Sequence, residues 1–80
     1  NPVTTISYEM PSAGTVDLSV YDVSGRLVKR LVAGEVAGAG RHAVTWDGTN
    51  DAGRAVATGV YLCRLEANGH ARTQMMVMVK

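Results

Sequence analysis

The sequence predicts an all-β fold, a two-layer antiparallel sandwich of seven strands. No stretch carries apolar residues at helical spacing, whereas Val, Thr, Ile and Tyr recur in short alternating runs. Turn-forming residues separate these runs. In such a sandwich each strand buries every second residue between the two facing sheets. With 80 residues, 46% of them hydrophobic, residues 1–80 suit one globular domain with a single core.

The first three strands follow from this alternation. We expect strands over residues 3–10 and 15–21, separated by a turn over 11–14. Asp17 and Ser19 should face outward from the second strand. Residues 22–25 predict a type I turn that closes on Gly25, with residues 26–32 as the returning strand. The side chains expected to face the core are Ile6, Tyr8, Met10, Val16, Leu18 and Val20.

The middle of the chain is richer in turns. Residues 33–40 contain three glycines and predict an open loop. Residues 41–46 alternate again and end in Trp46, which should be the largest core residue. Residues 47–53 are dense in turn formers, and residues 54–57 predict a short, weakly paired seventh strand.

The clearest hairpin joins residues 60–67 to residues 70–79. Asn68-Gly69 stands between them, and this dipeptide favours a type I′ turn because both central residues need positive φ. A two-residue turn fixes the pairing, so Tyr61 should lie opposite Met76. One face of the hairpin then forms core, from Tyr61, Cys63, Leu65, Met76 and Met78.

The opposite face of this hairpin is the candidate interaction face. It carries four apolar residues, with Arg64, Glu66 and Thr73 beyond them. In one interpretation the face binds no partner: a neighbouring loop covers the apolar residues, and single exposed apolar side chains are common in any case. Alternatively, they form a docking surface for another protein or for another copy of this chain. The candidate residues are Val60, Leu62, Met75 and Val77.

Charge and composition exclude several partners. The net charge is +1, and the basic residues are scattered without a run that could follow a phosphate backbone, so we expect no nucleic acid partner. No apolar run approaches the roughly 20 residues that span a bilayer. Cys63 is the only cysteine, so no intramolecular disulfide can form. The expected partners are therefore proteins.

No residue set predicts catalysis, a cofactor or a metal. The loop that begins at Asp47 places Ala52 and Thr58 where a calcium loop needs Gly and Glu, so we interpret it as a turn capped by its own side chains. Cys63 should be a buried thiol with a raised pKa rather than a nucleophile. His42 and His70 lie on different hairpins, and neither has a second metal ligand nearby in the predicted arrangement.

Four segments carry a family resemblance: residues 21–26, 40–48, 53–54 and 59–65. Together they resemble the Ig-like domains shared by type IX secretion C-terminal sorting domains and the flagellar hook-capping protein. The resemblance implies an Ig-like, fibronectin-III-like sandwich without catalytic activity. Asn1 stands where a complete chain would begin with Met, so we expect a piece of a longer polypeptide. The resemblance implies that this piece is the C-terminal module of an exported protein, with the rest of that parent protein or the secretion machinery as partners of the candidate face.

The resemblance implies two functions. The first is a sorting or anchoring module of a secreted or cell-surface bacterial protein, which a secretion apparatus recognises. The alternative is a structural or capping module of an extracellular filament or flagellar-hook-like assembly, which self-associates through its apolar face or a free strand edge. Both place the domain outside the cell or on its surface. One sandwich serves many roles, so the site has to decide between them.

Overall fold

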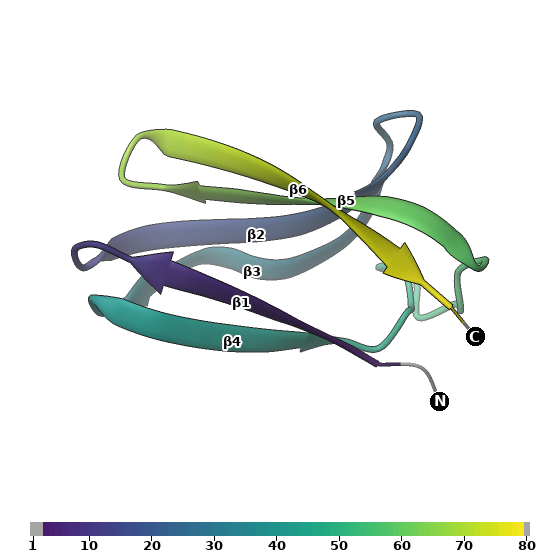
Figure 1. The fold of residues 1–80 in the computed structure, drawn as a ribbon, viewed down its shortest axis with the longest axis horizontal. Coiled ribbons are helices and arrows are strands. Elements are labelled where there is room, and N and C mark those ends of the chain that lie inside the picture. The colour runs from purple at the N-terminus through teal and green to yellow at the C-terminus, as the bar shows by residue number, and fades with distance from the viewer. Residues whose placement is uncertain (1–2, 80) are drawn as a thin grey trace.

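The computed structural model describes residues 3–79 and forms a β-sandwich of two unequal sheets (Figure 1). The smaller sheet pairs β1 with β4, and the larger sheet has the order β3-β2-β5-β6, with all pairs antiparallel. The all-β antiparallel sandwich is thereby confirmed. The six strands are β1 (Thr4–Met10), β2 (Gly14–Asp22), β3 (Leu27–Ala37), β4 (Gly40–Trp46), β5 (Gly59–Ala67) and β6 (His70–Met78).

The core lies between the two sheets, where the alternating residues meet. The side chains predicted to face it in β2 are less than 2% exposed. Trp46 is fully buried and is the largest of the fully buried side chains, as predicted. Its ring meets the Tyr61 ring edge-on, with 5.2 Å between centroids. Such an arrangement suits the quadrupoles of the two rings and joins the smaller sheet to β5.

The predicted loop over residues 33–40 is wrong, because β3 continues to Ala37. The strand absorbs an extra residue there: Leu18 pairs with Val32, whereas Val16 pairs with Glu35. Gly34 takes φ 63° in this bulge, and its N–H donates to the Asp17 carboxylate at 2.8 Å. Glycine adopts the left-handed region at little energetic cost. Gly34, which suggested a loop, therefore permits a bulged strand instead.

The predicted seventh strand over residues 54–57 is also wrong. Only Ala55 forms a bridge, to Thr49, within the segment that links β4 to β5. The Asn50 side chain accepts the N–H groups of Ala52 and Arg54, each at 3.0 Å. These local hydrogen bonds hold the backbone in turns, so few of its N–H and C=O groups are free to pair with a neighbouring strand.

The link between β4 and β5 is anchored at both ends by core side chains. Trp46 donates its indole N–H to the Thr49 carbonyl at 2.8 Å, and the Tyr61 hydroxyl donates to the Ala57 carbonyl at 2.6 Å. The middle of the link reaches β3, where Asp51 donates its N–H to the Val28 carbonyl and its carboxylate accepts the Arg30 N–H. The link therefore covers part of the outer edge of β3.

The predicted turns are confirmed. Gly25 has φ 89° and donates to the Asp22 carbonyl at 3.0 Å, which closes the first hairpin. Asn68 and Gly69 have φ 53° and 78°, as a type I′ turn requires. The Asn68 amide also donates to the Ser12 hydroxyl at 3.1 Å, which ties this turn to the one between β1 and β2.

Candidate interaction surface

The predicted register places the candidate face on the outer side of the larger sheet. Leu62 pairs with Met75 and Val60 pairs with Val77, as the two-residue turn predicted. Val60, Met75 and Val77 are 38%, 68% and 60% exposed, and Leu62 is half-buried. No described loop covers these side chains enough to remove them from water. They form a continuous apolar patch on β5 and β6.

The patch extends further than the sequence indicated. Tyr21 is the β2 neighbour of Leu62, and Leu27 is the β3 neighbour of Tyr21. Residues opposite each other in neighbouring strands point to the same face. One apolar row therefore crosses all four strands, and we call it the apolar row. It consists of Leu27, Tyr21, Leu62 and Met75, with Val60 and Val77 beside it.

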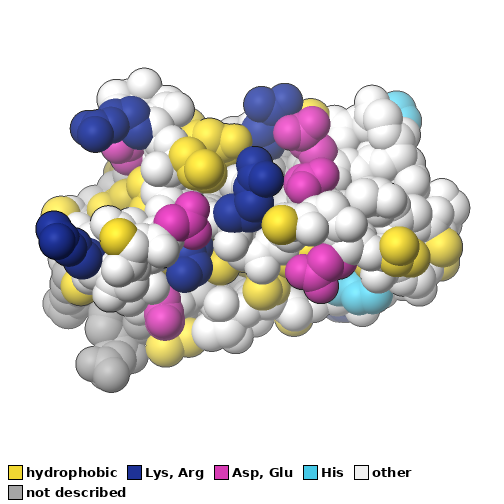
Figure 2. Space-filling model, turned by 180° about the vertical axis from the view of Figure 1, so that it is seen from behind, with side chains coloured by type: hydrophobic (Ala, Val, Ile, Leu, Met, Phe, Trp, Pro, Cys, Tyr) yellow, Lys and Arg dark blue, Asp and Glu magenta, His cyan; other side chains and the backbone are white. Residues whose placement is uncertain are grey.

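Polar rows run beside the apolar row on the same outer face. In the first, Ser19 lies between Arg30 and Arg64. In the second, Asp17 pairs with Glu66. Figure 2, which views the molecule from behind, shows basic and acidic side chains over this side with hydrophobic ones among them. On this outer face the apolar row is therefore followed by a basic row and, beyond that, by an acidic row.

Ser19 departs from the prediction because it is 5% exposed, although it points outward. It lies in β2, an inner strand of the larger sheet, with an arginine on either side in the ladder. The long aliphatic stems of arginine can cover a small neighbour while their charged ends stay in water. Arg64 also approaches Glu66, at 3.7 Å from Nε to Oε1, and both side chains are about half exposed. A pair so exposed contributes little stability.

Candidate chemical groups occupy structural positions. Asp47 accepts hydrogen bonds from the Thr49 hydroxyl and N–H, at 2.6 and 3.1 Å, as a self-capped turn requires. The hydroxyl bond is the main reason why the pKa of Asp47 is lowered. Burial raises the pKa of the Cys63 thiol, which faces the core as predicted. Within residues 3–79, no three His, Cys, Asp or Glu side chains gather where a metal could bind.

The two histidines lie apart. His42 stacks on Tyr8 with 5.3 Å between ring centroids, and its Nε2 is 2.7 Å from the Gly38 carbonyl oxygen. His70 is exposed at the start of β6. The two histidines thus belong to different sheets, and neither is part of a group of three possible metal ligands among the described residues.

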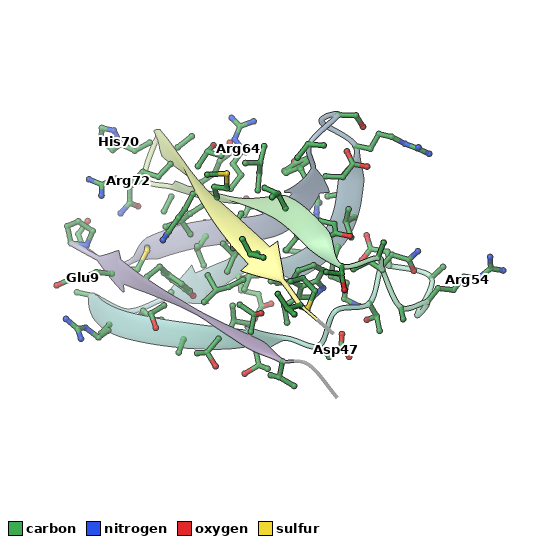
Figure 3. All side chains as sticks on the ribbon, turned by 45° about the vertical axis from the view of Figure 1, so that its right-hand side comes forward. Glu9, Asp47, Arg54, Arg64, His70 and Arg72 are labelled. Atoms are coloured by element: carbon green, nitrogen blue, oxygen red, sulfur yellow. The ribbon has the colours of Figure 1, made fainter. Side chains whose placement is uncertain are left out.

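A groove of about 830 Å³ runs between β1 and the β5–β6 hairpin. Its apolar wall includes Met10, Leu18 and Leu65, and Glu9, Arg72 and His70 are among its polar residues. Figure 3 shows His70 and Arg72 on β6 at the same end of the sandwich as Glu9 on β1. No helix in residues 3–79 is long and apolar enough to cross a membrane.

Comparison with known proteins assigns the family. The family model described as the FlgD Ig-like domain matches residues 3–70. A solved structure, FLGD from P. aeruginosa, is similar with a TM-score of 0.70 and 24% sequence identity. That match covers 96% of this chain but 59% of the FLGD chain, so this domain spans little more than half of that protein. No curated protein matches. The chain belongs to the FlgD Ig-like domain family.

Proposed function

We propose that this domain is a non-catalytic module that docks onto protein partners within an extracellular, flagellar-hook-like assembly. The exposed apolar row of the larger sheet carries the proposal. Three residues of the row and its flank, Val60, Met75 and Val77, keep 38%, 68% and 60% of their surface exposed. Contiguous exposed apolar residues on a small soluble domain mark a surface that another protein covers.

The surroundings of the row support a protein as the partner. An interface has an apolar centre and a polar rim, and aromatic and arginine side chains are enriched in it. The outer face offers Tyr21 in the row and Arg30 and Arg64 beside it. Membership of the FlgD Ig-like family and similarity to FLGD agree with a role in an assembly outside the cell.

A sorting or anchoring module of an exported protein is the second candidate function. The four sequence segments that resemble type IX sorting domains favour it, since those domains are read by a secretion apparatus. Fusing residues 1–80 to a reporter would test it: a sorting module should bring the reporter to the surface of a bacterium with that apparatus. A reporter that stays inside would contradict this candidate.

Site-specific photo-crosslinking tests the proposed docking. A photoreactive phenylalanine analogue would replace Val77 in the protein that contains this domain, expressed in its native cells. We expect a covalent adduct with a protein partner. The adduct should disappear when Leu62→Lys and Met75→Lys are added, because two ammonium groups would have to be desolvated in the interface.

Two controls make this experiment decisive. The same analogue at Thr45, an exposed residue of β4 in the smaller sheet, should give no such adduct. Ala71→Lys and Thr73→Lys add the same charge to β6 outside the apolar row and should leave the adduct in place. Equal adducts from Val77 and Thr45, or an adduct that survives the changes in the row, would contradict the proposal. Light scattering of the purified chain would then show whether the partner is a second copy.

A further inference from the structure

The two outer edges of the larger sheet are protected to different degrees. The pairing of β3 with β2 shifts register at three places, and Asp51 bonds to the β3 backbone at Val28 and Arg30. Bulges and covering loops keep a strand edge from pairing with other chains. In contrast, β6 pairs with β5 without a shift over nine residues, and no described strand or loop pairs with its other edge. The larger sheet thus has one regular, open edge.

The turn at Asn68-Gly69 determines which backbone groups of β6 are unpaired. Ala67 and His70 flank this two-residue turn and bond to each other, so the N–H and C=O of His70 point toward β5. Along an antiparallel strand, the backbone N–H and C=O groups of successive residues point alternately to the two sides of the strand. The backbone groups of Ala71, Thr73, Met75 and Val77 therefore point outward, away from β5.

Two of these residues also belong to the exposed apolar surface. Met75 and Val77 have unpaired backbone groups at the edge and exposed side chains on the outer face. A strand added beside β6 would bond to these backbone groups and place its own alternate side chains next to Met75 and Val77. The open edge of β6 and the exposed apolar surface beside it therefore both favour an extended segment that carries apolar side chains.

The inner side of β6 specifies the charge of that ligand. His70, Arg72 and Gln74 pair with residues whose side chains face the core, yet all three are exposed, and they line the groove between β6 and β1. Arg72 forms no ion pair with any described residue, including Glu9, the acidic residue of the same groove. A carboxylate on the added strand would complement this charge.

We propose that β6 accepts an extended segment of a partner protein as a fifth strand of the larger sheet, with apolar residues against Met75 and Val77 and an acidic residue beside Arg72. This inference deepens the proposed function, because it gives the chemistry of the docking partner. A second copy of β6 fits less well: the strand contains no acidic residue to place beside Arg72.

A synthetic heptapeptide tests the inference on the 80-residue chain. Antiparallel to β6, the sequence Val-Thr-Val-Thr-Thr-Asp-Thr puts valines opposite Val77 and Met75 and the aspartate opposite Arg72. We expect binding by fluorescence anisotropy at up to about 1 mM peptide. Amide exchange followed by NMR should slow at Ala71, Thr73, Met75 and Val77 and stay unchanged at the residues between them. No binding in that range would overturn the proposal.

Substitutions on β6 separate strand addition from other docking. Thr73→Pro removes an unpaired N–H and keeps the apolar row, so the domain should fold and lose the peptide. Gln74→Pro removes an N–H that bonds to β5 and should destabilise the fold. This result would confirm that the backbone groups of β6 point alternately toward and away from β5. Arg72→Gln should weaken binding about two- to fivefold, the range of an exposed ion pair. A peptide with Lys in place of Asp should bind the unaltered domain more weakly than the Asp peptide.

The outcomes distinguish this inference from the proposed function. If Leu62→Lys with Met75→Lys abolishes the cellular adduct but Thr73→Pro changes neither adduct nor peptide binding, docking stands and strand addition is wrong. If slow exchange at Thr73 and Met75 develops with protein concentration and without peptide, a second copy is the ligand, and the inference is overturned.

Discussion

Replacement of Tyr61 by Phe isolates the hydrogen bond that anchors the β4–β5 link. The Tyr61 hydroxyl donates to the Ala57 carbonyl at 2.6 Å, and Phe keeps the edge-on contact with Trp46. Ala57 is exposed, so its carbonyl can bond to water once the hydroxyl is gone. The loss should therefore be that of an ordinary hydrogen bond, about 1 kcal/mol of unfolding free energy. For a domain of this size, Tm should fall by about 4–8 °C.

Urea unfolding measures this loss. We expect the midpoint to fall while the slope of free energy against urea stays constant, because the area exposed on unfolding hardly changes. Tyr8→Phe is the matched control: Tyr8 is half-buried, stacks on His42, and its hydroxyl bonds to no described residue. The control should change stability by less than about 0.5 kcal/mol. Equal losses in the two variants would refute the assignment of the anchor to the Tyr61 hydroxyl.

Three further predictions concern other parts of the fold. Gly14→Ala should cost about 1–2 kcal/mol in thermal unfolding, because a Cβ at Gly14 would meet the Asn68 side chain and displace it from its hydrogen bonds; an unchanged Tm would contradict this reading. The pKa of Asp22 is lowered from 3.8, chiefly by the hydrogen bond from the Ser24 hydroxyl. This carboxylate therefore stabilises the fold above pH 3.8, and its contribution is lost as the pH falls further. Asp22→Asn should remove that part of the acid dependence of stability in unfolding curves. Cys63 is 6% exposed and its pKa is raised, so a thiol reagent at pH 8 should label it only in denaturant, and rapid labelling of the folded domain would show that the core opens.

The sequence predicted those parts of the fold that local chemistry determines. Asn68-Gly69 fixed the last hairpin, since its turn type allows one register, and the candidate face followed from that register. Alternation correctly placed Trp46 in the core. These features depend on neighbouring residues alone.

Features that depend on contacts distant in sequence could not be predicted. Gly34 lies in a strand because the Asp17 carboxylate accepts its N–H, a partner on another strand. Leu27 joins the apolar row only because the pairing of β2 with β3 shifts near the turn, so counting alternate residues missed it. The signal that could have found it is Tyr21, which alternates in step with the outward residues Asp17 and Ser19 and stands just before the turn. Ser19 is buried by its arginine neighbours, which no periodicity reveals.

The unequal division of strands between the two sheets has a consequence for folding kinetics. Both local hairpins, β2–β3 and β5–β6, belong to the larger sheet, whereas the smaller sheet joins two strands distant in sequence, β1 and β4. Closing long segments of chain costs entropy before any contact compensates for it, so the larger sheet should nucleate folding and β1–β4 should pair late. Truncating Ile6 or Val44 should then mainly accelerate unfolding, whereas truncating Leu18 should slow folding.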